Sequence, residues 1–96
     1  MNQLEQARDA VLERKSLEDM KTAGHDMQEA VRAAEQAVQA ARDLIDGLPD
    51  AEQRAVCRYR YLLAYTWQDT ASAMGCDMST VFRRHRRAMR NLGFKA

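Results

Sequence analysis

The sequence contains few residues that interrupt helices and few that build sheets. Of its 96 residues, one is proline and four are glycine, and aromatic residues make up only 6%. Hydrophobic residues nevertheless reach 46% and charged residues 30%. A disordered chain would be poorer in apolar residues, and a β-rich chain would hold more turn formers and aromatics. The composition therefore predicts an all-α protein.

Long apolar runs and clustered metal ligands are missing as well. No stretch approaches the roughly 20 apolar residues that span a bilayer, and no signal pattern follows Met1, so we expect no membrane contact and a cytoplasmic location. Cys57 and Cys76 are expected to be reduced core thiols. Neither His25 nor His85 forms a short ligand spacing with a cysteine, so we expect no metal or cofactor. Without a nucleophile–base pair or a glycine-rich phosphate loop, the chain is not expected to be an enzyme.

The net charge of +1 conceals two halves of opposite sign. Residues 1–50 contain six Lys/Arg and eleven Asp/Glu, a net charge of −5, whereas residues 51–96 contain nine and three, a net charge of +6. No acidic residue follows Asp77. Such asymmetry indicates two functions. We predict an acidic helical or coiled-coil segment over residues 1–47 and a basic domain over residues 48–96.

The acidic segment is expected to be helical and to divide near Gly24. Asn2 can cap a first helix, Gly24 suits the position after its end, and Asp26 can cap a second helix that begins at Met27. The first helix has a thin apolar stripe of Leu4, Ala7 and Val11. These cap signals favour a helical hairpin. One long helix is the alternative, because a single glycine costs only about 1 kcal/mol relative to alanine.

The second helix carries a regular apolar seam. Spacings of four and three residues alternate along it, as in a coiled coil, through Met27, Val31, Ala34, Val38, Ala41, Ile45 and Leu48. The sharper interpretation is a homodimer formed through the seam residues from Met27 to Ile45. The other is packing against the chain's own first helix or its C-terminal domain. A domain this small is only marginally able to bury its own core, which favours some partner for the seam.

Two short helices are predicted next. Gly47 ends the seam helix, and Asp50 caps a helix that runs to about Leu63. Its inward residues would be Val56, Cys57, Tyr61 and either Leu62 or Leu63. Its outward charges would be Arg54, Arg58 and Arg60. Thr66 and Asp69 have capping-box spacing for a helix through Met74, and Gly75 suits the left-handed residue that ends it.

The last helix is crowded with arginine. Asp77 can cap a helix from Met78 to Leu92. One stripe of that helix can face a core and comprises Val81, His85, Ala88, Met89 and Leu92. The opposite face carries Arg83, Arg84, Arg86, Arg87 and Arg90, with Lys95 just beyond. An unopposed basic face attracts a polyanion, and a short helix, a tight turn and a basic helix have the layout of a helix-turn-helix.

The stretch from Leu48 to Leu92 resembles region 4 of sigma-70 class factors, which reads the promoter −35 element. The matching features are Leu48-Pro49, Arg60-Tyr61-Leu62, Thr66-Trp67, Ala71 with Met74-Gly75, Ser79-Thr80-Val81, and Ala88-Met89 with Leu92. The chain is similar more specifically to small phage and prophage regulators of the RinA and ArpU type, on the residues Val81, Arg84-His85 and Ala88-Met89. It departs from the pattern at Thr70, where an aliphatic residue is usual, and at Ala64, where glycine is usual.

This resemblance implies an N-terminal helical segment followed by a three-helix domain that binds double-stranded DNA and regulates transcription. Base edges would be read by Met78, Ser79, Thr80, Phe82 and Arg83. Phosphates would be held by Arg84, Arg86, Arg87, Arg90 and Lys95. His85 and Trp67 are expected in the core. The alternatives are a protein-binding sigma mimic that contacts RNA polymerase or another regulator, and a recognition subunit of a phage DNA-packaging machine.

Overall fold

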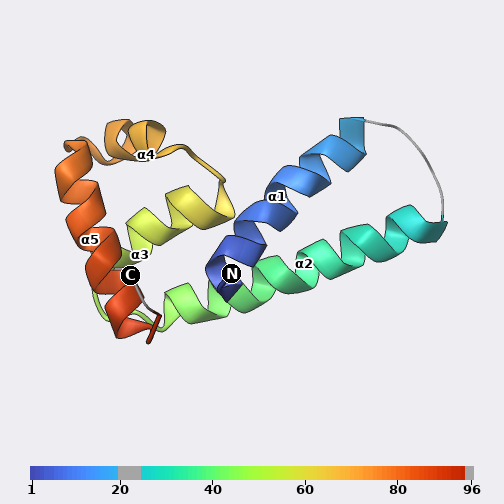
Figure 1. Cartoon of the computed structure of the whole chain (residues 1–96), viewed down its shortest axis with the longest axis horizontal. Helices are drawn as coiled ribbons and strands as arrows, with labels where there is room; N and C mark the ends of the chain where they lie inside the picture. Colours follow the sequence, from blue (N-terminus) through green and yellow to red (C-terminus); the bar gives the residue numbers. More distant parts are fainter. Residues whose placement is uncertain (20–24, 95–96) are drawn as a thin grey trace.

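The computed structural model describes the backbone of residues 1–19 and 25–94 and the side chains of residues 1–15 and 28–94. All regular structure in these residues is helical, which confirms the predicted all-α class (Figure 1). The elements are α1 (Gln3–Asp19), α2 (His25–Asp46), α3 (Ala51–Cys57), a π-helical segment η1 (Arg58–Leu62), α4 (Trp67–Met74) and α5 (Met78–Asn91). No helix among these residues is long and apolar enough to cross a bilayer.

The acidic segment forms a helical hairpin in which α1 lies antiparallel against α2 (Figure 1). Asn2 caps α1 as expected, since its Oδ1 accepts a hydrogen bond of 2.9 Å from the Glu5 amide. The second helix begins at His25, two residues before the expected start at Met27. The predicted break at Gly24 lies outside the described residues.

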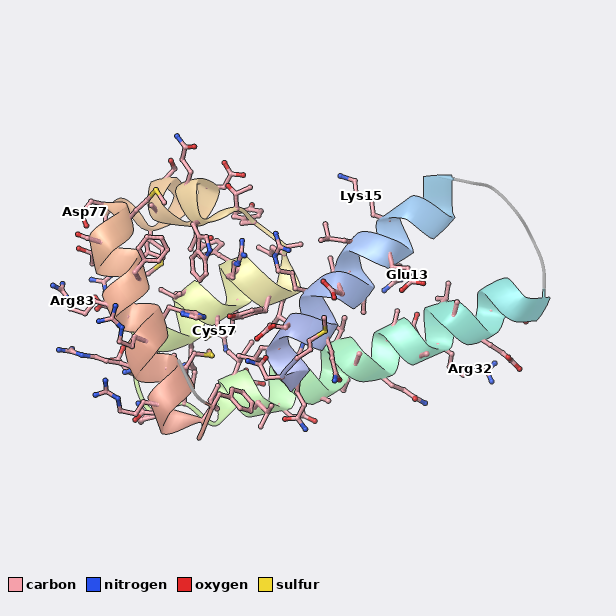
Figure 2. All side chains as sticks on the ribbon, in the orientation of Figure 1. Glu13, Lys15, Arg32, Cys57, Asp77 and Arg83 are labelled. Atoms are coloured by element: carbon pink, nitrogen blue, oxygen red, sulfur yellow. The ribbon has the colours of Figure 1, made fainter. Side chains whose placement is uncertain are left out.

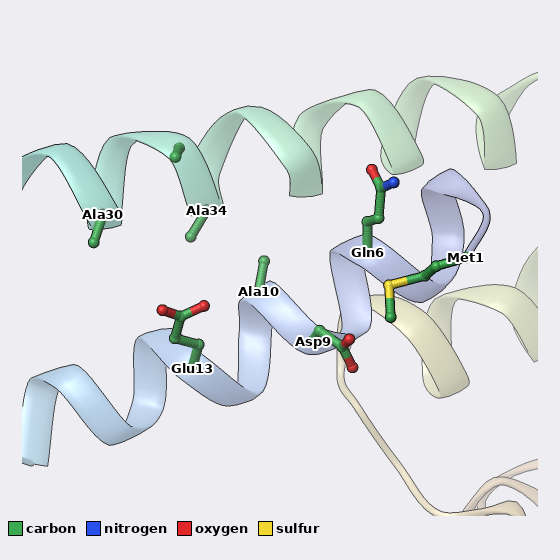
Figure 3. Close-up of a pocket in the computed structure, with 8 residues that line it drawn as sticks. Met1, Gln6, Asp9, Ala10, Glu13, Ala30 and Ala34 are labelled. Carbon is green, nitrogen blue, oxygen red and sulfur yellow. The ribbon is translucent and has the colours of Figure 1, made fainter.

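Small side chains form the interface of the hairpin. Ala10 of α1 points toward Ala34 of α2, and both are buried beside a groove of about 300 Å³ (Figure 3). Ala41 and Ile45 of the seam are fully buried as well. Two other seam residues, Val31 and Val38, are only half-buried. The Met27 side chain is outside the described residues. The buried part of the seam therefore packs within its own chain, which is the second of the two interpretations drawn from the sequence.

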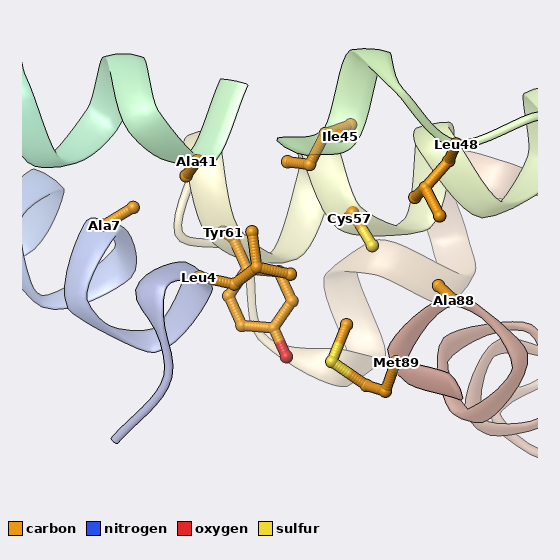
Figure 4. Close-up of a cluster of buried hydrophobic side chains, with 9 residues drawn as sticks. All are labelled: Leu4, Ala7, Ala41, Ile45, Leu48, Cys57, Tyr61, Ala88 and Met89. Atoms are coloured by element: carbon orange, nitrogen blue, oxygen red, sulfur yellow. The ribbon is translucent and has the colours of Figure 1, made fainter. Parts of the chain in front are cut away.

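One apolar core joins the hairpin to the C-terminal helices (Figure 4). It contains Leu4 and Ala7 of α1, Ala41 and Ile45 of α2, Leu48, Cys57, Tyr61, and Ala88 and Met89 of α5. Leu4 is 0% exposed, so burial of its side chain contributes about 1.5–3 kcal/mol. The first helix thus completes the core on which the last helix rests.

The third helix changes its hydrogen-bonding register partway along. Asp50 caps α3 by accepting from the Glu52 and Gln53 amides at 2.7 and 3.2 Å. After Cys57 the chain continues as η1, where the Leu63 amide donates to the Arg58 carbonyl five residues earlier, at 3.0 Å. The sequence predicted a single α-helix to Leu63. The structure differs from this prediction in the wider π-helical turn over Arg58–Leu62.

Candidate nucleic-acid interface

Caps and one glycine position the two C-terminal helices as predicted. Thr66 Oγ1 accepts a 3.0 Å hydrogen bond from the Asp69 amide at the start of α4. Gly75 ends α4 with a φ of +66°, a conformation that glycine adopts without steric cost. Asp77 then caps α5, accepting 2.8 Å from the Thr80 amide. The predicted helix-turn-helix bounds are confirmed to within one residue, since α5 ends at Asn91 rather than Leu92.

The capping carboxylate also orders the first turn of α5. Ser79 Oγ donates a 3.0 Å hydrogen bond to Asp77 Oδ1. Hydrogen bonds from Thr80, followed by the one from Ser79, lower the pKa of Asp77, so the cap stays ionised. Two of the predicted base-reading residues are therefore held in place by their cap. The Ser79 hydroxyl hydrogen is engaged, and its oxygen remains an acceptor.

A second apolar cluster fixes the angle between α4 and α5. It consists of Val56, Ala71 and Val81, with Trp67, Met74 and Cys76 packed against it. Thr70 is fully buried beside Ala71, at the position where the resemblance predicts an aliphatic side chain. Its hydroxyl donates to the Thr66 carbonyl at 2.8 Å, which satisfies the polar group without a solvent contact.

His85 belongs to the interior of the C-terminal domain, as expected. Its Nε2 is hydrogen-bonded to the Tyr61 hydroxyl, and its ring meets Trp67 edge-on at 4.8 Å between centroids. Burial, followed by the nearby Arg60 charge, lowers the pKa of His85. The imidazole is therefore neutral at physiological pH and serves packing.

The outer face of α5 is basic and exposed. Its exposed arginines are Arg83, Arg86, Arg87 and Arg90. Side chains tipped with nitrogen project away from the body of the molecule here, Arg83 among them (Figure 2). None of these four forms an ion pair with any described residue. Arg83 and Arg90 are seven residues apart, which is close to two turns, so they lie one above the other on this face.

The Arg84 side chain is not part of the exposed basic face of α5. Its guanidinium lies 3.0 Å from the Glu52 carboxylate and 3.9 Å from Cys76 Sγ, and it is only 24% exposed. It links α5 to the start of α3. Lys95, the other outlying cation predicted to contact phosphate, lies outside the described residues. Of the residues predicted to contact phosphate, Arg86, Arg87 and Arg90 are therefore the ones that are exposed and form no ion pair with a described residue.

Two apolar residues flank the basic face near its beginning. Met78 and Phe82 are 40% and 38% exposed. The Phe82 ring is held edge-on to Trp67 at 5.2 Å between centroids. The Arg60 guanidinium in turn stacks over the Trp67 ring, 4.3 Å from its centre. Phe82 is thus presented on a rigid aromatic support.

The arginines of α3 and η1 were predicted to face outward, and this was wrong for two of them. Arg54 is half-buried and donates to the Leu48 carbonyl at 2.6 Å. Arg60 is half-buried over Trp67 and donates to the Tyr65 carbonyl at 3.1 Å. Only Arg58 is exposed, and it pairs with Asp46 at 2.9 Å. Arg60 lies within η1, whose hydrogen bonding departs from the α-helical period that the prediction assumed.

Comparison with known proteins agrees with this geometry. A family model described as "Sigma-70, region 4" matches residues 38–92, which is more than half of the chain. The match begins in the second half of α2 and extends through α5. No curated protein and no solved structure gives a match. Among the described residues, no cluster of His, Cys, Asp or Glu could hold a metal ion.

Proposed function

The chain belongs to the sigma-70 region 4 family, and on this basis we propose that it is a DNA-binding transcription regulator whose α5 enters the major groove. The observation that carries the proposal is the row of exposed arginines on α5 without any acidic neighbour on the same helix. DNA has a dense line of phosphates, and such a row neutralises several of them at once. The narrower role of a phage or prophage regulator rests only on the resemblance at Val81, Arg84-His85 and Ala88-Met89.

The proposed division of work follows position along α5. The first two turns carry Met78, Ser79, Phe82 and Arg83 at the exposed surface, with Thr80 half-buried beside them. In a helix-turn-helix, the N-terminal residues of the second helix approach the base edges. The Arg83 guanidinium can form a bidentate pair with guanine, and Phe82 can contact a thymine methyl group. The later arginines contact phosphates and set the register.

Salt dependence tests the electrostatic part of the proposal. Three phosphate contacts and one arginine–base contact correspond to a slope of log K against log salt of about −3 to −4. Fluorescence anisotropy with a labelled duplex, titrated at several salt concentrations, measures this slope. An affinity that does not change with salt would contradict the proposal.

Single substitutions test the division between reading and positioning. Arg83→Ala should lose about 1–3 kcal/mol on a selected site and relax the preference at one base pair. Arg87→Ala should weaken selected and random DNA equally. Arg32→Ala, an exposed residue of α2 in the hairpin, is the matched control and should leave both affinities unchanged. Equal losses for Arg83→Ala on selected and random DNA would remove the assignment of Arg83 to base reading.

RNA polymerase is a second candidate partner, favoured by an apolar surface away from α5. Leu63 is 54% exposed, and it lines a depression with Leu62, Arg42, Asp46 and Arg58. Exposed apolar patches rimmed by polar residues mark protein-interaction sites. If polymerase is the main ligand, Leu63→Asp should abolish its binding and leave DNA affinity intact. If DNA is the main ligand, Leu63→Asp should bind DNA normally and Arg87→Ala should not.

The homodimer expected from the sequence would require a different packing of the hairpin. Ala34, Ala41 and Ile45 are already covered within the chain, so a dimer through them would require α1 to leave. We propose instead that the hairpin serves the core of its own chain and that the protein binds DNA as a monomer. Sedimentation at tens of micromolar should give the monomer mass. A dimer that Val38→Asp dissociates would reinstate the seam as an intermolecular contact.

A further inference from the structure

A cavity of about 330 Å³ lies where α1 meets the C-terminal helices. Its volume falls in the lower part of the range typical of small-molecule sites. One wall comes from the N-terminal residues and the other from η1, α4 and α5. The lining residues are Met1, Glu5, Arg8, Asp9, Arg60, Tyr61, Trp67 and His85.

Two half-buried arginines, Arg8 and Arg60, line this cavity, and both carry an unsatisfied donor. The Nε atoms of Arg8 and Arg60 are buried and have no hydrogen-bond partner. Buried donors without an acceptor are rare, and each calls for an explanation, such as a bound ion. Burial, followed by the charge of Arg8, lowers the pKa of Arg60, so the two cations are close enough to repel one another.

The two carboxylates that line this cavity do not pair directly with its two arginines. Among the described residues, neither Arg8 nor Arg60 forms an ion pair. The carboxylates of Glu5 and Asp9 line the same cavity but are exposed to solvent. The Tyr61 hydroxyl and His85 Nε2 are hydrogen-bonded to each other, so that part of the wall is neutral. The cavity therefore contains two guanidinium groups whose Nε donors lack a hydrogen-bond acceptor.

We propose that this cavity binds a small oxyanion, a phosphate or carboxylate group, between Arg8 and Arg60. A guanidinium presents its N–H donors in a planar fork that matches the oxygens of either group. Arg60 is already oriented for this role by its stacking on Trp67 and its hydrogen bond to the Tyr65 carbonyl. The bound anion would join α1 to η1. The nearby carboxylates of Glu5 and Asp9 oppose it and keep the affinity modest.

Side-chain NMR tests the site directly, with inorganic phosphate as the probe. The Nε–H signals of Arg8 and Arg60 are followed at constant ionic strength while phosphate replaces chloride, and a second titration uses acetate. Both signals should shift and saturate, with phosphate stronger if a phosphate group is the natural ligand and acetate stronger if a carboxylate is. Arg8→Gln should raise the apparent Kd at least about tenfold, because a charge-assisted hydrogen bond is lost.

Two further variants complete the design. Glu5→Gln removes a repelling charge and should lower the Kd, a gain that a merely misfolded variant would not give. Arg32→Gln, on the exposed face of α2, should change nothing. The proposal is overturned if the Arg8 and Arg60 signals move linearly together with those of Arg83 and Arg87, or if Arg8→Gln binds as well as the unmodified protein. DNA binding is measured separately by anisotropy, so this site can fail while the DNA-binding proposal stands.

Discussion

Replacing Ala64 by glycine should stabilise the protein, because residue 64 has a left-handed backbone conformation. It connects η1 to α4 with a φ of +57°, the left-handed region, where it is the one residue other than glycine among those described. An L-residue with a Cβ loses about 1–2 kcal/mol in this conformation. Glycine avoids that cost but loses about 0.5–1 kcal/mol more conformational entropy on folding. The midpoints of these two ranges differ by about 0.7 kcal/mol, so Ala64→Gly should stabilise the fold by that amount and raise the Tm by about 3–6 °C.

The same substitution in a helix should have the opposite sign. Ala40 is exposed in the middle of α2, so Ala40→Gly should cost about 1 kcal/mol and lower the Tm. Thermal unfolding followed by circular dichroism at 222 nm measures both variants under the same conditions. If Ala64→Gly lowers the Tm as Ala40→Gly does, the left-handed conformation at residue 64 does not strain the chain, and the reasoning from its backbone angle fails.

Two further predictions concern the core and its titration. Leu4→Ala should destabilise the protein by about 2–5 kcal/mol in urea unfolding. Leu12→Ala, at a side chain 44% exposed, should change stability by less than about 1 kcal/mol. Similar effects of the two substitutions would contradict the placement of α1 in the common core. Because burial lowers the pKa of His85 in the folded state, the unfolded chain binds that proton more readily, so the stability contributed by neutral His85 is complete above the unfolded pKa of about 6.5 and falls as the pH drops below it. His85→Gln should flatten the Tm between about pH 7 and pH 5, and an unchanged pH profile would show that His85 does not titrate on unfolding.

The sequence predicted those parts of the fold that depend on local chemistry. Asn2, Asp50, Thr66 and Asp77 all act as the expected caps, and Gly75 ends α4 in the expected conformation. Each of these signals needs only a few neighbouring residues. The exposed arginine face of α5 follows in the same way from helical periodicity.

The parts that depend on contacts between distant residues were less accessible. Periodicity identified the seam of α2 but could not say whether Ala34 and Ile45 meet another chain or their own, since both give the same pattern. The π-helical turn departs from the α-helical period that the prediction assumed, and Arg60 within it lies half-buried over Trp67 rather than outside. Arg84 looked identical to its neighbours in sequence, and only the position of Glu52 distinguishes it.

The core shown in Figure 4 also constrains when the protein can complete its folding during synthesis. Leu4 and Met89 belong to one cluster although nearly the whole chain separates them. During synthesis, the first helix leaves the ribosome long before α5 exists, so its apolar stripe has no complete surface on which to dock. Folding that closes such distant contacts is slower than folding built from neighbours. The core that supports the proposed DNA-binding surface can therefore be completed only after α5 has been released, and it needs residues of both α1 and α5.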